Sequence, residues 1–560
     1  MTVNSCLDSV SHLSLALANV RMEEFCGISC FFDGTNDFRT ILSDDCLLQE
    51  RKDEYGDWQT NMDLALAICR LMKKQGVSPR VLIEPTCGKG HFILAALQTF
   101  DSIEEIYGIE IYKPYLDCLK LSILQYFLDN PSARKIKINL YHQNVFDFDF
   151  ASIKKLINSR EVLVVGNPPW VTNSTLGEKH SDNLPPKTNF KKKKGLDAIT
   201  GKGNFDIAEY ICLQMIDFLI GEKANLALLV KNSVAKNIVY EQRRVRFPIN
   251  VIEQYNIDAK KEFNVSVAAS LLCMNLGEKI SLRCQVRDFY SLRLVQEYGW
   301  VDNCFVADTH AYNQHRYMDG KSTLTWWSGV KHDCAKIMEL VLDKGRYLNG
   351  LGQVVDIEEE RVYPLLKSSD ITNDVLTSTR KYVIITQKTP SDDTKWLAKA
   401  CPKTYQYLME HAAFLDERGS SIYHKRPRFC LFGIGDYSFK KYKVVVSGLY
   451  KHVHFSLVKP INGKPVMLDD TCYSLGFDEY ENALVAQRIL NCPEVQSFMR
   501  SLLFLDSKRV VNKDLLMRID WLNIIGHIRK ENVGVSAVAW DKFVSYLSKS
   551  VSPKQFYLFS

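Results

Sequence analysis

The sequence lacks the paired cysteines that would indicate a zinc cluster or a disulfide framework. Its 16 cysteines are spread singly, without a Cys-x-x-Cys pair, and only Cys26 and Cys30 lie close together. Zinc sites and disulfide-linked domains show closely spaced cysteines, so we expect reduced, buried thiols and no metal. No cysteine follows a proline, which removes the Pro-Cys context that an enzyme attacking cytosine C5 through a thiolate would need.

A secretion signal and a membrane-spanning run are also missing. No lysine or arginine precedes the apolar stretch 13–20, whereas a signal peptide has such basic residues there. No apolar run is long enough to cross a bilayer. The net charge is only +6 and the pI is near 8.4, which is too weak to indicate a nucleic-acid partner by itself. A chain of 560 residues with 46% hydrophobic content should form about two or three domains. The sequence therefore predicts a cytoplasmic, multidomain protein.

A glycine turn follows an apolar strand early in the chain. The strand at 81–83 leads into Glu-Pro-Thr-Cys-Gly-Lys-Gly-His-Phe at 84–92, and an apolar helical run follows at 93–97. Gly88 and Gly90 allow unusual dihedrals and close backbone approach, as in dinucleotide-binding turns, although the full GxGxxG spacing is absent. Glu110 ends a second apolar strand about 20 residues later, where a carboxylate holds ribose hydroxyls in doubly wound folds. A solvated acid at a strand end is the alternative.

A second turn, after the apolar strand 162–166, reads Asn167-Pro168-Pro169-Trp170. The two prolines fix φ and remove backbone donors, which leaves carbonyls to accept hydrogen bonds from an amino group. Asn167 adds a side-chain carbonyl, and Trp170 offers a π-face on which a planar base lifted out of a nucleic-acid stack can lie. An ordinary Pro-Pro turn after a buried strand is the alternative.

The order of these motifs resembles that of the S-adenosylmethionine-dependent adenine-N6 DNA methyltransferases of restriction-modification systems, in the arrangement with cofactor motifs first and the target-recognition region last. The match spans roughly residues 50–280, and its motifs are specific jointly rather than singly. The resemblance also includes 55–60, which closes over the methionine end of the cofactor in the family, although Thr60 or Asn61 is equally interpretable as a helix N-cap. It implies cofactor contacts from these residues: Thr60, Glu84, Pro85, Cys87, Gly88, Gly90, Phe92, Glu110 and Asn167.

The residues that bind the cofactor adenine are ambiguous in the sequence. The family usually has an Asp closely followed by Phe after the third strand, whereas this chain has Gln-Asn-Val-Phe-Asp-Phe at 143–148. Asn144 with Phe146 fits the family spacing better, and an Asn carbonyl accepts a hydrogen bond as a carboxylate does. Asp147 with Phe148 is the alternative.

The chemistry of adenine methylation fits the Asn-Pro-Pro-Trp turn. The exocyclic amine is a poor nucleophile because its lone pair is delocalised into the ring, so Asn167 and the Pro168 carbonyl help by accepting its N–H bonds. A sulfonium methyl is already activated, so positioning and preoriented polar groups should supply most of the catalysis, without a metal. In the family a second aromatic ring contacts the flipped base, and Phe263 stands at the matching place. A plain core phenylalanine would look the same in the sequence.

Basic clusters suggest where DNA binds. Four consecutive lysines follow the Asn-Pro-Pro-Trp turn, and as a loop they would contact phosphates with salt-sensitive affinity, although a solvated charge run is the usual interpretation. Beyond about residue 285, basic residues interleave with aromatics, which suits a groove that reads phosphates and base edges. The DNA-binding candidates are Lys191, Lys192, Lys193, Lys194, Lys425, Arg426, Arg428, Lys440 and Lys441.

The predicted organisation is an α/β chain with a Rossmann-like, doubly wound methyltransferase sheet followed by a mixed α+β target-recognition domain. The expected segments are an N-terminal extension (1–50), a catalytic domain that binds S-adenosylmethionine (51–285) and a DNA target-recognition domain (286–560). We expect a monomer or weak dimer that acts on double-stranded DNA by base flipping and protects it from a cognate restriction endonuclease. RNA adenine methylation, protein glutamine methylation and non-catalytic DNA binding by a degenerate methylase fold are the alternatives.

Overall fold

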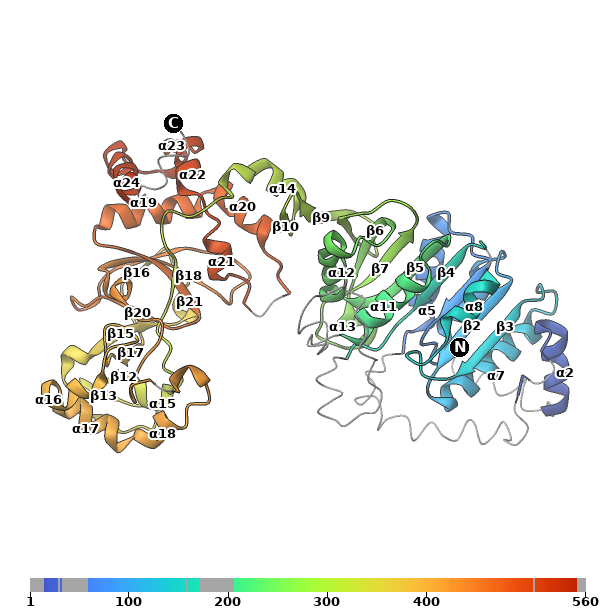
Figure 1. The fold of residues 1–560 in the computed structure, drawn as a ribbon, viewed down its shortest axis with the longest axis horizontal. Helices are drawn as coiled ribbons and strands as arrows, with labels where there is room; N and C mark the ends of the chain where they lie inside the picture. Colours follow the sequence, from blue (N-terminus) through green and yellow to red (C-terminus); the bar gives the residue numbers. More distant parts are fainter. Residues whose placement is uncertain are drawn as a thin grey trace. The chain divides into compact units, whose positions relative to one another are not determined.

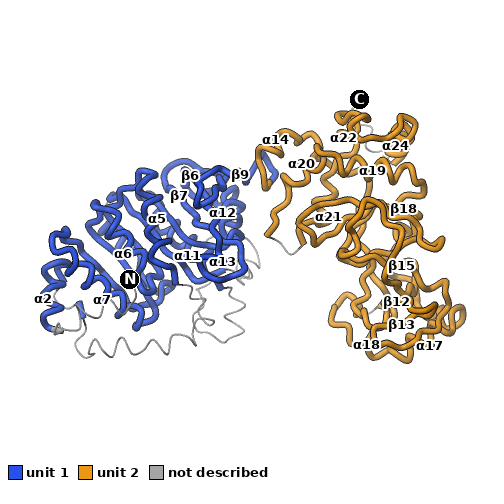
Figure 2. Tube along the Cα trace, turned by 180° about the vertical axis from the view of Figure 1, so that it is seen from behind, with its two compact units in different colours: residues 1–305 blue, residues 306–560 orange. Residues whose placement is uncertain are grey.

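The computed structural model describes residues 15–28, 31–32, 59–157, 159–171, 206–424, 426–506 and 509–550. The chain divides into two compact units, residues 1–305 and 306–560 (Figure 2). The lysine run at 191–194 and Lys425 lie outside the described residues. No helix in the described ranges is long and apolar enough to cross a membrane.

Unit 1 is built on a ten-stranded sheet with the strand order β10-β9-β8-β6-β7-β5-β4-β1-β2-β3 (Figure 1). The strands from β3 to β5 pair in parallel, and β7 is antiparallel to both β5 and β6. The strands are β1 (Val81–Glu84), β2 (Glu105–Glu110), β3 (Lys137–His142), β4 (Val162–Gly166), β5 (Ala224–Lys231), β6 (Ile249–Ile257), β7 (Ala269–Leu276), β8 (Arg283–Asp288), β9 (Leu294–Val301) and β10 (Cys304–Val306).

The helices of unit 1 form two contacting series, as expected for a doubly wound sheet. Helices α2, α7, α6 and α5 contact one another in that order, and α8, α11 and α12 form the other series. The expected α/β fold class is confirmed. The helices are α2 (Leu15–Cys26), α5 (Met62–Lys74), α6 (His91–Thr99), α7 (Lys113–Asp129), α8 (Phe150–Ile157), α11 (Ile207–Phe218), α12 (Asn232–Val245) and α13 (Ala259–Phe263).

The central strands follow from their apolar runs. Every residue of β1 and β4 is buried, which is typical of parallel strands covered on both faces. Helix α5 starts at the N-cap Asn61, whose side chain accepts a hydrogen bond from the Leu64 N–H at 2.8 Å. Asn61 therefore has the N-cap role that the sequence allowed.

The boundary between the units lies later than the sequence suggested. A division after residue 285 would cut β8, which pairs in parallel with β6 and antiparallel with β9. These pairings extend the sheet, and the compact unit ends at Phe305. At the other end, α2 lies within the expected N-terminal extension but contacts α7, so the described part of that extension belongs to unit 1.

Unit 2 is a mixed α+β unit with two sheets, in agreement with the expected class. The five-stranded sheet has the order β11-β21-β18-β19-β16, and the six-stranded sheet has the order β14-β13-β12-β17-β15-β20. The strands are β11 (Trp327–Ser328), β12 (Glu339–Asp343), β13 (Arg346–Leu348), β14 (Val354–Val355), β15 (Val362–Leu366), β16 (Val375–Leu376), β17 (Lys381–Ile384), β18 (Tyr442–Ser447), β19 (Ser456–Val458), β20 (Met467–Leu468) and β21 (Cys472–Phe477).

Short helices complete unit 2. The helices are α14 (Thr309–His315), α15 (Ala335–Met338), α16 (Leu397–Ala400), α17 (Pro402–Glu410), α18 (Ala412–Asp416), α19 (Tyr480–Asn491), α20 (Pro493–Leu502), α21 (Lys513–Leu516), α22 (Trp521–His527), α23 (Lys530–Val533) and α24 (Ala537–Ser550). The cysteines among the described residues are free thiols, most of them buried.

A buried carboxylate ties three parts of the six-stranded sheet of unit 2 together. Glu339 is 5% exposed, and its oxygens lie 2.5 Å from Lys367 Nζ, 2.6 Å from Lys381 Nζ and 3.4 Å from His332 Nε2. Burial opposes ionisation of Glu339, but the hydrogen bonds from His332, Lys367 and Lys381 outweigh it and hold the pKa at about 2.

This cluster predicts acid sensitivity of unit 2. The folded pKa of about 2 lies below the ordinary 4.5, so the stabilisation is fully present above pH 4.5 and is lost as the pH falls toward 2. The loss amounts to about 3 kcal/mol. We expect the free energy of unfolding of Glu339→Gln, measured by urea titration, to fall less steeply over this range than that of the wild type. Asp356→Asn, at an exposed carboxylate, is the control and should keep the wild-type slope.

Candidate functional site

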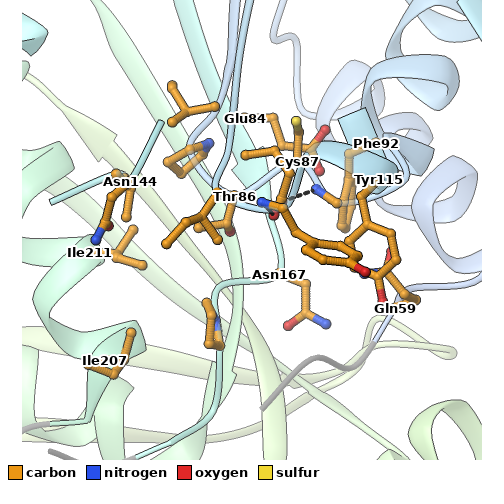
Figure 3. Close-up of a pocket in the computed structure, with 18 of the residues that line it drawn as sticks. Gln59, Glu84, Thr86, Cys87, Phe92, Tyr115, Asn144, Asn167, Ile207 and Ile211 are labelled. Carbon is orange, nitrogen blue, oxygen red and sulfur yellow. Dashed lines mark hydrogen bonds between the residues drawn. The ribbon is translucent and has the colours of Figure 1, made fainter. Parts of the chain in front are cut away.

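A cavity of about 200 Å³ opens at the carboxyl ends of β1, β2, β3 and β4, where open α/β sheets bind their ligands (Figure 3). It brings together segments that are up to about 150 residues apart. Its lining residues are Gln59, Thr60, Glu84, Pro85, Thr86, Cys87, Gly88, His91, Phe92, Ile109, Glu110, Ile111, Tyr112, Tyr115, Gln143, Asn144, Val145, Phe146, Asn167, Pro169, Ile207 and Ile211.

The glycine turn between β1 and α6 needs both of its glycines. Gly88 has φ +51° and Gly90 has φ +76°, in the left-handed region that favours glycine. A Cβ atom on Gly90 would lie 2.0 Å from Leu119 Cδ1 of α7. Gly90 therefore lets α6 and α7 pack closely, while Gly88 lines the cavity.

Glu110 braces this turn from the end of β2. One of its oxygens accepts a hydrogen bond from the Gly88 N–H at 2.8 Å, and the other accepts from the Tyr112 N–H at 2.8 Å. Glu110 is 8% exposed and lines the cavity. Glu110 is therefore not a solvated acid at the end of a strand, which was the alternative that the sequence left open.

Three polar atoms of the β1 and α5 side of the cavity are buried without a hydrogen-bond partner in the described structure: Glu84 Oε2, Thr60 Oγ1 and Thr86 Oγ1. Burial raises the pKa of Glu84 well above its ordinary value, and the charge of Glu110 adds to this shift. Buried polar groups are nearly always hydrogen-bonded in native proteins. This wall is therefore suited to a polar ligand that supplies the missing partners.

The segment after β3 bears on the choice between the two pairs that the sequence left open. Asn144 and Phe146 line the cavity, and Asn144 Oδ1 accepts a hydrogen bond from the Phe146 N–H at 3.1 Å. Asp147 is exposed and is not among the lining residues. Phe148 packs against Tyr141, with ring centroids 4.9 Å apart. The geometry therefore favours the pair Asn144 and Phe146 over the pair Asp147 and Phe148.

The Asn-Pro-Pro-Trp turn is divided between the cavity and the core. Asn167 and Pro169 line the cavity and are partly exposed, whereas Pro168 is buried. Trp170 is 6% exposed, and its indole N–H donates to the Leu229 carbonyl at 3.2 Å.

Phe263 covers Trp170. The two ring centroids are 5.1 Å apart at an interplanar angle of 70°, and Phe263 is itself 6% exposed. Trp170 therefore lacks the open π-face that the sequence suggested, because tertiary packing brings Phe263 of α13 against its ring. The two aromatic candidates are neighbours in space, although they lie 93 positions apart in the sequence.

Several lining residues belong to no motif of the sequence, among them Tyr115, Ile207 and Ile211. His91 also lines the cavity, next to Gly90 of the glycine turn. Burial lowers the pKa of His91, and the Thr60 backbone opposes this shift through a hydrogen bond. Gln59 Oε1 accepts from the Lys89 N–H at 3.3 Å. These residues reach the cavity through the tertiary fold, which a local pattern does not report.

The basic candidates of unit 2 are partly neutralised. Lys440 Nζ lies 2.6 Å from Asp478 Oδ2, and Arg428 forms an ion pair with Asp416. The Arg426 guanidinium lies 6.0 Å from the ring centroid of Phe432, and Lys441 Nζ lies 5.4 Å from the ring centroid of Tyr442. Ion pairs reduce the charge that Arg428 and Lys440 offer to phosphates.

Comparison with known proteins identifies the family. Type II methyltransferase M.NspV of Nostoc sp. is 38% identical over 476 residues, which cover 84% of this chain and 97% of M.NspV. The DNA complex of the type IIL restriction-modification enzyme MmeI matches 97% of this chain and 80% of its own at 12% identity, with a TM-score of 0.49. A putative class I S-adenosylmethionine-dependent methyltransferase from Listeria monocytogenes matches 52% of this chain and 92% of its own at 12% identity, with a TM-score of 0.33.

No protein-family model matches the chain. The assignment therefore rests on M.NspV, whose identity to this chain extends over most of both proteins. By this relationship, the chain belongs to the type II methyltransferases.

Proposed function

We propose that the protein transfers a methyl group from S-adenosylmethionine to the N6 amino group of an adenine flipped out of double-stranded DNA, and so protects that DNA from a cognate restriction endonuclease. The observation that carries the proposal is the shared cavity. Asn167 and Pro169 line the same cavity as the glycine turn, Glu110 and Asn144. The proposed amine acceptor and the proposed cofactor site thus line one cavity.

The residues of the cavity fit S-adenosylmethionine. The unpartnered oxygens of Glu84, Thr60 and Thr86 suit the amino and carboxyl groups of the methionine end. We assign to Glu110 the hydrogen bonds from the ribose hydroxyls, which acids at this strand end accept in doubly wound folds. When bound, the cofactor supplies a sulfonium-activated methyl group.

The apolar part of the cavity suits the adenine end of the cofactor. Phe146 is buried at the cavity wall, and Ile207 and Ile211 of α11 line the same cavity. Asn144 supplies a polar side chain for the edge of the base. Flat apolar surfaces with one polar edge contact are what a buried purine requires.

Asn167 is the proposed amine acceptor. It stands directly after β4, a strand buried along its whole length, and the prolines that follow restrict the backbone. These features fix the backbone from which the side-chain carbonyl projects, and preoriented acceptors lower the barrier most because they need no reorganisation. Accepting the N–H bonds of the amine favours a pyramidal nitrogen whose lone pair is available for methyl transfer.

Trp170 and Phe263 are the proposed contacts of the extruded base, which requires the two rings to separate, because they pack against each other at a centroid separation of 5.1 Å in this structure. Trp170→Ala should reduce kcat/KM on a duplex with an intact target pair by about tenfold or more. The loss should be smaller on a mismatched target, because a loosely paired base costs less to extrude. Steady-state kinetics on the two duplexes measure the difference, and thermal unfolding controls for the loss of a buried ring. Equal losses on both duplexes would rule out this role.

The proposal is tested by incubating the purified protein with labelled S-adenosylmethionine and, in parallel, with plasmid DNA, RNA or a glutamine-containing protein, and by mapping modified bases in the DNA with single-molecule sequencing. N6-methyladenine at one recurring sequence is the expected result. Label in RNA or in protein glutamine instead of DNA would move the assignment to those amino groups. DNA binding without label transfer would mark a non-catalytic protein.

A further inference from the structure

We propose that Glu262 is a positioning residue that joins the cofactor wall to the aromatic pair Trp170 and Phe263, an inference that rests on the proposed function. Glu262 Oε2 accepts a hydrogen bond from Asn61 Nδ2 at 3.1 Å, and Glu262 Oε1 accepts from the Tyr290 hydroxyl at 2.8 Å. Its side chain is 10% exposed. One carboxylate thus bridges the start of α5, the end of α13 and the turn between β8 and β9.

The Asn61 end of this bridge leads to the cofactor cavity. Asn61 caps α5 through its Oδ1 atom, which accepts from the Leu64 N–H at 2.8 Å, so its amide is oriented with Nδ2 toward Glu262. The preceding residue is Thr60, which lines the cavity with a buried hydroxyl. The position of Asn61 therefore sets that of the cavity wall beside it.

The Glu262 end of the bridge leads to the aromatic pair Trp170 and Phe263. Glu262 belongs to the five-residue helix α13, and Phe263 is its last residue. The Phe263 ring covers Trp170 at a centroid separation of 5.1 Å. A short helix has few internal hydrogen bonds to fix it, so contacts from outside, such as that with Asn61, determine where Phe263 lies.

Tyr290 supports the carboxylate from the other side. Partial burial and the adjacent Glu262 raise the pKa of Tyr290 to about 12, so its hydroxyl remains a donor at neutral pH. Lys261 Nζ lies 4.8 Å from the centroid of the Tyr290 ring. Both carboxylate oxygens of Glu262 are thus engaged by donors from distant segments, and a shift of α13 would break both contacts.

The consequence is a link between methyl-donor binding and base binding. Loss of the bridge should raise the KM for S-adenosylmethionine, through Thr60, and lower kcat, through Phe263. A purely structural role would instead lower the unfolding midpoint and the active fraction without moving KM.

The test uses a pair of substitutions with opposite chemistry. Asn61→Asp keeps the N-cap oxygen, because Asp caps helices as well as Asn, but it sets a second carboxylate against Glu262. Adding Glu262→Gln to Asn61→Asp restores a donor toward residue 61 and keeps an acceptor for the Tyr290 hydroxyl. Asp101→Asn, at a side chain exposed to solvent, is the control. It exchanges an acid and an amide at a position outside the bridge.

We expect Asn61→Asp to lower kcat/KM for S-adenosylmethionine by about tenfold or more, and the double variant to recover to within about threefold of the wild type. Asp101→Asn should match the wild type. A double variant that is no better than Asn61→Asp, or an Asn61→Asp enzyme with wild-type kinetics, would overturn the role of Glu262 while leaving the proposed function intact. A wild-type protein without methyl transfer would overturn both.

Discussion

Asn167→Ala should reduce methyl transfer by at least about a hundredfold in kcat, the scale on which loss of one preoriented hydrogen-bonding group acts at an active site. The affinity for S-adenosylhomocysteine should change by less than about threefold, because the polar atoms proposed to hold the cofactor belong mainly to β1, β2 and α5. Single-turnover kinetics on a duplex substrate and calorimetric titration of the cofactor product measure the two quantities separately.

Asn167→Asp is the matched variant. It keeps an acceptor oxygen at nearly the same place, so it should retain more activity than Asn167→Ala. Wild-type turnover by Asn167→Ala would remove the amine-acceptor role, and equal activity of the two variants would show that the side-chain oxygen does not act on the amine.

Glu110→Ala should weaken binding of S-adenosylmethionine by about a hundredfold, since hydrogen bonds to a charged group contribute about 1.5–3 kcal/mol each. The structure adds a second cause. The carboxylate accepts from the Gly88 and Tyr112 N–H groups at 2.8 Å, so its removal also loosens the glycine turn. Equilibrium titration with the cofactor product is the direct measurement.

The effect on the fold can be separated from the effect on the ligand. Leaving the buried Gly88 N–H without an acceptor should cost about 1–3 kcal/mol of stability, which urea titration of the ligand-free protein detects. Glu104→Gln, just before β2 and in an exposed ion pair with Arg80, is the control and should bind cofactor normally. Unchanged affinity in Glu110→Ala would remove this acid from the cofactor site.

The two turns that follow strands β1 and β4 were predictable because their signals are local. Fully apolar strands predict buried parallel strands, and glycines at 88 and 90 predict the positive φ values that the structure contains. Both turns lie at carboxyl ends of neighbouring strands, so topology brings them to one cavity. Sequence and structure agree there because the backbone conformation of each turn itself requires the residue type found there.

The limits of the sequence lie where side chains from distant segments meet. The spacing at 143–148 left two pairs open, and only packing shows that Asn144 faces the cavity while Asp147 is exposed. The sequence also predicted an exposed Trp170 ring on which a base can stack, whereas the ring of Phe263 packs against it. The bridge from Asn61 to Glu262 spans 201 residues, and no pattern along the chain reports it.

The sequence by itself determined the α/β class, the two motif turns and the identity of the polar groups at their ends, because strand burial, glycine dihedrals and proline rigidity act within a few residues. The tertiary structure decided which of those groups face the cavity, which are covered and where unit 1 ends. These outcomes depend on contacts between segments far apart in the chain, and such contacts form only when the sheet assembles and its helices pack.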